Sequence, residues 1–140
     1  MRLGILALIL FVCVPFVSAQ SDMVSLTLLH TSNVIDLHEV GSDNIGGTAR
    51  VATVISDARA NNDNVLLLDG GDRFINPTSF DRNAEIMNEL GYNGMAFGNH
   101  EFNGGNVGVL NFLEALDFPL LAANIDFSAS PILAERIPAF

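Results

Sequence analysis

Short apolar runs alternate along this chain with segments of helical periodicity, and this alternation limits the folds that the chain can adopt. The runs have the β-branched and apolar content of buried strands, and the segments between them repeat apolar residues at helical spacing. We predict strands over 24–29, 65–68, 92–97 and 118–123, and helices over 46–60, 79–90 and 107–116. Such alternation favours an α/β fold with parallel strands. Beyond Asn124 the pattern weakens, and Pro131 and Pro138 predict irregular chain.

Polar side chains follow three of the predicted strands, at the point where each strand ends. Asp36 and His38 follow the first strand, Asp72 follows the second, and Asn99 and His100 follow the third. Ligands of open α/β sheets gather at the carboxyl ends of the strands, so we expect these loops to converge on one site. The glycines in the last two loops would let the backbone approach a crowded centre closely.

The donor atoms in these loops suit a divalent metal such as Zn or Mn rather than a soft copper site. Two metals about 3.5–4 Å apart would lower the pKa of a bridging water and clamp a phosphate. The chain has a formal net charge of −10, so bound cations rather than basic side chains would attract a phosphate. This charge also disfavours nucleic acid or an anionic membrane as the main partner. The structural alternative is a turn that Asn99 caps, with His100 as a solvated loop residue.

The first 19 residues have the pattern of a secretory signal peptide. A short basic start precedes an apolar run over 3–17, and small residues ending at Ala19 follow it. An uncleaved anchor is the alternative, although the run is short for a membrane span. The single Cys13 lies in this segment, so the mature chain, residues 20–140, has no cysteine for a disulfide or a thiolate metal site.

Five motifs of this chain occur in the order that is typical of the 5′-nucleotidase family: LLHTSNVIDLH, GGTARVATVI, LLLDGGDRF, MAFGNHEFNGG and LLAANI. The chain resembles this family from Leu26 to Ile125. Members are secreted or periplasmic calcineurin-like metallophosphoesterases. The resemblance implies an α/β sandwich of αββα layers, with only the first half present here. It also implies hydrolysis of phosphate esters, above all 5′-nucleotides to nucleoside and phosphate, by a metal-activated water.

The resemblance assigns roles to individual residues. Asp36 and His38 look like the D-x-H pair that binds the first of two divalent metals. Asp72 resembles the carboxylate that bridges both metals. Asn99 resembles the ligand of the second metal, whose side chain also touches the substrate phosphate. His100 looks like the histidine that stabilises the transition state or protonates the leaving alkoxide.

The first motif departs from the family, which reads H-T-N-D-x-H without interruption. Here the same stretch is HTSNVIDLH. Either two residues are inserted and Asp36 and His38 are the ligands, or a gapless match places Asn33 and Ile35 at those positions. An isoleucine has no donor atom, so the second option would disable the first metal site. We favour the first option, because a D-x-H pair lies so close by.

Three further residues near the predicted site have roles of their own. Asn103 stands where the family commonly has Asp, and an amide orients an imidazole without stabilising its protonated form as a carboxylate would. We expect a slower enzyme or a shifted pH optimum. Glu101 is expected to brace its loop, through a salt bridge or as a cap. Arg73 could reach a substrate phosphate, although an exposed ion pair is the favoured interpretation.

The sequence after His100 contains no further histidine. The family completes its metal shell with downstream histidines, including a G-H-x-H motif, and then adds a C-terminal substrate domain. The chain is therefore predicted to be the first half of a catalytic domain, inactive alone. One alternative is a degenerate relative that binds metal or nucleotide weakly or not at all. Another is a plain α/β interaction domain without a site.

Overall fold

The structure, a computed structural model, describes residues 23–34, 40, 46–73 and 80–137. Several sequence-based predictions fall outside these residues. The predicted signal peptide is one of them, and the candidate metal ligands Asp36 and His38 are others.

Four strands form one parallel sheet in the order β1-β2-β3-β4. They are β1 (Thr27–Thr31), β2 (Val65–Asp69), β3 (Gly94–Ala96) and β4 (Leu120–Leu121). The predicted α/β class with parallel strands is confirmed, and every strand ends at the same edge of the sheet. The register places Thr31 beside Asp69, so the polar residues that end β1 and β2 are neighbours across the sheet.

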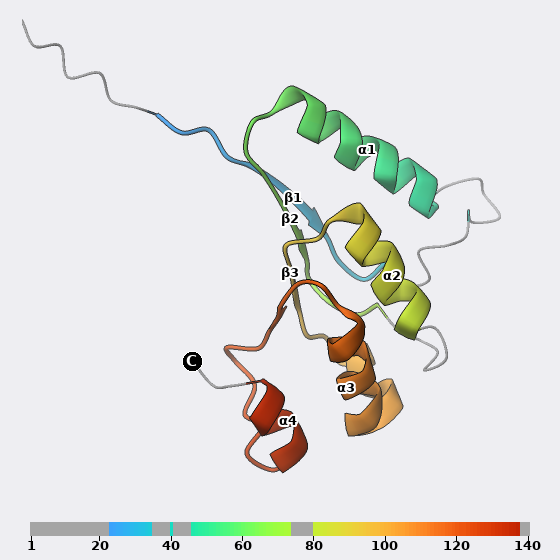
Figure 1. The fold of residues 1–140 in the computed structure, drawn as a ribbon, viewed down its shortest axis with the longest axis vertical. Helices are drawn as coiled ribbons and strands as arrows, with labels where there is room; N and C mark the ends of the chain where they lie inside the picture. The colour runs from blue at the N-terminus through green and yellow to red at the C-terminus, as the bar shows by residue number, and fades with distance from the viewer. Residues whose placement is uncertain (1–22, 35–39, 41–45, 74–79, 138–140) are drawn as a thin grey trace, which may run out of the picture.

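Helices connect the successive strands and lie on one side of the sheet (Figure 1). The elements between and after the strands are α1 (Thr48–Asn61), α2 (Phe80–Leu90), the 3₁₀ helix η2 (His100–Gly104), α3 (Gly105–Ala115) and α4 (Pro131–Arg136). Parallel crossovers are right-handed, so a sheet that grows strand by strand in one direction places every crossover helix on the same face. Within the described residues, no helix is both long enough and apolar enough to cross a bilayer.

Helix α4 corrects the prediction of irregular chain beyond Asn124. Pro131 is its first residue, a position where the missing N–H of proline removes no helical hydrogen bond. Its Leu133 is buried against Val109 of α3 and Ala122 after β4. Packing on α3 stabilises a helix that is too short to persist alone.

The main core lies between the sheet and helices α1 to α3. Buried side chains of the sheet meet buried side chains of the helices there: Leu67, Met95 and Leu120 with Ile55, Met87 and Phe112. On the opposite face of the sheet, Leu28 is 59% exposed and Leu121 is 42% exposed. Parallel sheets are normally covered on both faces. This apolar face is where we expect the second sheet of the predicted sandwich, which is not among the described residues.

The first prediction tests this assignment of the core. Met95 is fully buried between the sheet and the helices, whereas Met23 is 92% exposed. Met95→Ala should lower the free energy of unfolding by about 2–5 kcal/mol, because it leaves a cavity in the core. The same substitution at Met23 should change this free energy by less than about 0.5 kcal/mol. Urea denaturation measures both, and equal effects would contradict the core described here.

Candidate functional site

The turn after β2 presents Asp72 at the edge of the sheet. Gly71 and Asp72 have backbone φ angles of 90° and 61°, so two consecutive residues are in the left-handed region. Glycine adopts this region freely, and Asp tolerates it better than most other residues. The chain therefore turns sharply as the strand ends. Such strained positions persist only where the surrounding structure holds them, and they occur often at functional sites.

The loops after β2 and β3 touch each other. A Cβ atom added to Gly98 would lie 2.1 Å from Oδ1 of Asp72, so only glycine fits there. The backbone N–H of His100 donates a hydrogen bond to the same Oδ1 atom, at 3.1 Å. The structure thus brings Asp72 and His100 together at the sheet edge, as expected from their places at the strand ends. Asn99 precedes His100 in this loop and is exposed.

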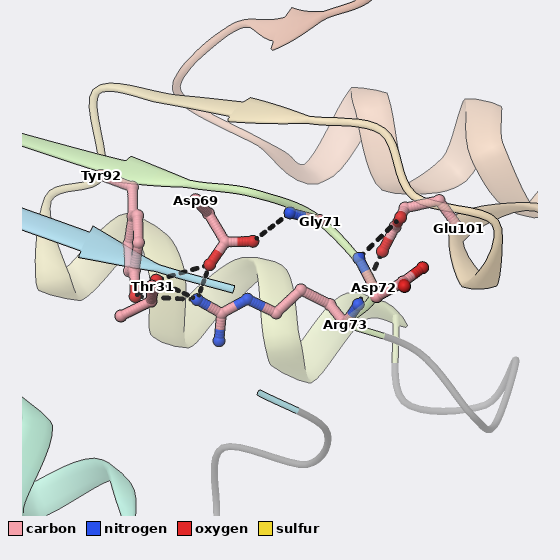
Figure 2. A network of polar contacts seen from close by, with 7 residues as sticks. All are labelled: Thr31, Asp69, Gly71, Asp72, Arg73, Tyr92 and Glu101. Carbon is pink, nitrogen blue, oxygen red and sulfur yellow. Dashed lines mark hydrogen bonds and ion pairs between the residues drawn. The ribbon is translucent and has the colours of Figure 1, made fainter. Parts of the chain in front are cut away.

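Glu101 braces its own loop, as predicted, through backbone N–H groups rather than a salt bridge, and it also ties this loop to the one after β2. Its side chain is buried and accepts three backbone hydrogen bonds, from Asp72 at 3.0 Å, Arg73 at 2.7 Å and Gly98 at 2.6 Å. Figure 2 shows the first two of these contacts. Three N–H donors compensate the carboxylate for its lost hydration. The turn that carries Asp72 is consequently anchored from the neighbouring loop.

His100 and Asn103 contact each other through their side chains. Nδ2 of Asn103 lies 3.0 Å from Nδ1 of the His100 ring. Residues three apart in a 3₁₀ helix lie on the same side, and η2 supplies this spacing. The contact leaves Nε2 as the ring nitrogen that can face a substrate. Asn103 is placed to orient the imidazole, and the catalytic roles of both residues stay predictions.

Arg73 is fully buried, so the prediction of an exposed ion pair is wrong. Its Nη2 atom is ion-paired with Asp69 and donates hydrogen bonds to Thr31 Oγ1 at 2.9 Å and to the Tyr92 hydroxyl at 2.8 Å (Figure 2). The turn after β2 sends the side chain back along the strand instead of outward. Because the guanidinium has no access to solvent, a contact between Arg73 and a substrate phosphate has no support in the structure.

Sequence reasoning missed the partners of Arg73. Thr31 ends β1, within the first of the quoted motifs, and Tyr92 precedes β3. No role was predicted for either, because their contact with Arg73 depends on the parallel register, which places Thr31 directly beside Asp69. A polar pair at the buried ends of adjacent strands requires a further polar partner.

The donor atoms at the sheet edge are suited to a divalent cation. A carboxylate has about four lone-pair sites, so Asp72 can accept the hydrogen bond from His100 and still bind metal. The side-chain oxygen of Asn99 is a neutral donor of the same hard type. The part of the chain that the structure describes contains no group of three or more His, Cys, Asp or Glu residues placed to hold a metal. A complete site therefore requires ligands from outside these residues.

The chain is similar in sequence to known phosphoesterases. The sequence profile of the calcineurin-like phosphoesterase family matches residues 27–138. A snake venom 5′-nucleotidase of Gloydius brevicauda is 42% identical over 123 residues, which cover 77% of this chain and 21% of that protein. The 5′-nucleotidase of Bos taurus is 39% identical over 128 residues, which cover 80% of this chain and 22% of that protein. The chain spans about a fifth of the length of the curated relatives it matches.

Solved structures agree with this similarity. A 5′-nucleotidase precursor from Thermus thermophilus superposes with a TM-score of 0.68 at 32% identity, over 80% of this chain and 24% of that chain. The NAD nucleotidase of Haemophilus influenzae superposes with a TM-score of 0.66 at 28% identity, over 76% of this chain and 22% of that chain. The fold of the described residues is thus that of the front part of these proteins' catalytic domains.

The second prediction tests the brace. Glu101→Ala should lower the free energy of unfolding by about 3 kcal/mol or more, because the N–H groups that Glu101 binds lose their acceptor. Glu101→Gln should cost less, since an amide oxygen still accepts. Glu114→Ala is a matched control at an exposed ion pair, and it should cost less than about 1 kcal/mol. Chemical denaturation measures all three, and a Glu101→Ala protein as stable as the control would refute the brace.

Proposed function

Given that this chain belongs to the calcineurin-like phosphoesterase family, we propose that it is the front part of a metal-dependent enzyme that hydrolyses 5′-nucleotides to nucleoside and phosphate. The observation that carries the proposal is the contact between Asp72 and the loop of Asn99 and His100. Through the backbone N–H of His100, this contact brings the loop that carries Asn99 and His100 to the Asp72 carboxylate, at the carboxyl edge of a parallel sheet. The relatives named 5′-nucleotidase support the substrate class. The complete protein would supply the remaining ligands and the nucleoside-binding part.

In this proposal Asp72 would hold both of two divalent metal ions, Zn, Mn or a similar cation. Asn99 would hold the second ion, and Asp36 with His38 would hold the first. Bound cations would supply positive charge for the phosphate and lower the pKa of a coordinated water. This charge matters because the chain itself carries a formal net charge of −10. The carboxylate and amide ligands hold the cations without adding a competing cationic side chain.

His100 acts on the substrate rather than on the metal. In the neutral ring, whose Nδ1 accepts the amide N–H of Asn103, Nε2–H can donate a hydrogen bond to a phosphate oxygen. Only the imidazolium, protonated on both nitrogens, can give a proton to the departing alkoxide and return to the neutral ring. Asn103 fixes the plane of the ring. The enzyme acts outside the cytoplasm, in the periplasm or the extracellular space. Support for this location comes from the signal-like first 19 residues and from the snake venom relatives.

A non-catalytic relative is the second candidate function. Asn103 in place of the family's Asp and the altered first motif favour a protein that at most binds metal or nucleotide. Metal binding without turnover of nucleotide by the complete protein would select this candidate. Turnover that depends on added metal would select the phosphoesterase.

The third prediction concerns Asp72. In the complete protein, Asp72→Ala should abolish uptake of divalent metal, because the carboxylate that bridges both ions is removed. Metal content after dialysis measures this effect. Asp81→Ala removes an exposed carboxylate from the first turn of α2 and should leave the metal content unchanged. A normal metal content in the Asp72 variant would refute the site assignment.

The fourth prediction concerns His100. His100→Ala should retain metal and lose about 100- to 10,000-fold in kcat on a 5′-nucleotide, the range expected for a lost proton donor. Steady-state kinetics and metal analysis of the same sample measure the two effects. Loss of metal from this variant would mean that His100 is itself a ligand.

A further inference from the structure

Asp69 binds residues on both sides of Asp72. One of its oxygens, Oδ1, accepts the backbone N–H of Gly71 at 2.9 Å. The other, Oδ2, is ion-paired with Arg73 and accepts the Thr31 hydroxyl at 2.5 Å. Asp69 thus fixes the chain just before and just after Asp72. The turn can shift only if the Asp69 carboxylate releases one of these groups.

Arg73 connects the turn to three strands. Its guanidinium reaches Asp69 at the end of β2, Thr31 at the end of β1 and Tyr92 just before β3. The ring of Tyr92 also lies under the charge, with its centroid 5.3 Å from Cζ. The side chain is therefore a buried strut that runs from the turn into the sheet (Figure 2).

A gain in folding stability does not explain why Arg73 is buried in an ion pair. A buried ion pair has a large desolvation cost and often contributes little net stability. Nε and Nη1 of Arg73 are buried without a hydrogen-bond partner in the structure as far as it is described, which adds to the cost. Burying Arg73 is costly, and yet its side chain contacts several residues. Its role is therefore better explained by holding the turn in position than by a gain in folding free energy.

We propose that Arg73 is a positioning residue that holds Asp72 in place for metal binding. This inference rests on the proposed function, in which Asp72 is the bridging ligand. Asp72 has a left-handed backbone that its surroundings must hold, and Figure 2 shows its carboxylate pointing away from the guanidinium. Arg73 also forms an ion pair with Asp69, the other aspartate of the DGGD turn. Asp69 is thereby kept in the core, and Asp72 alone faces the site.

The test is Arg73→Met in the complete protein, with metal affinity measured by titration of the metal-free protein with Mn²⁺. We expect Mn²⁺ to bind about 10- to 100-fold more weakly, the usual effect of losing a group that orients a ligand. Arg73→Lys should give an intermediate loss, because an ammonium can pair with Asp69, but the shorter lysine side chain does not reach the position of Nη2, the atom that makes all three contacts. Leu133→Ala is the control, since it loses core packing in α4 and should keep normal Mn²⁺ affinity while folded.

Comparison with Asp72→Ala separates this inference from the proposed function. Loss of Mn²⁺ binding in Asp72→Ala together with normal affinity in Arg73→Met would overturn the positioning role alone. Normal Mn²⁺ binding in Asp72→Ala would overturn both proposals. If Arg73→Met fails to fold, Arg73→Lys decides, and an affinity equal to that of the unaltered protein overturns the positioning role. A weakened affinity in Leu133→Ala would show that loss of stability alone explains the effect, and would overturn it as well.

Discussion

The close approach of two loops at one edge of the sheet is the constraint on which the candidate site depends. Gly98 lies so near the Asp72 carboxylate that a single added carbon atom would overlap it. Glu101 then binds backbone N–H groups of both loops from within the protein. Close contact and shared hydrogen bonds together make the two loops one unit. The positions of Asp72 and His100 relative to each other follow from this unit rather than from either loop alone.

A buried carboxylate and a buried ion pair support this unit in different ways. Glu101 is well compensated by backbone donors, so its burial adds stability and order at once. Arg73 and Asp69 form an ion pair with only part of the guanidinium satisfied among the described residues. A pair of that kind often contributes little net stability. Glu101 thus holds the backbone of the turn that carries Asp72, and the Arg73–Asp69 pair links the same turn to the sheet.

The one-directional order of the strands determines which face of the sheet the helices cover. With strands added in one direction, α1, α2 and α3 cover a single face, and an apolar face with Leu28 and Leu121 remains open. The chain belongs to the calcineurin-like phosphoesterase family and spans about a fifth of the length of the curated relatives it matches. Among the described residues, no group of three or more His, Cys, Asp or Glu residues is placed to hold a metal.

The sequence by itself determined the α/β class, the order of the elements and the edge at which the polar loops gather, because these follow from local periodicity and from the direction of parallel strands. The bracing role of Glu101 could also be predicted, since it lies beside the loop that it holds. Only the tertiary structure determined that Arg73 is buried and which residues it contacts. Its partner Thr31 is 42 positions away in the sequence, and only the strand register brings the two together. Helix α4 likewise depends on packing against α3, which no local pattern around Pro131 could reveal.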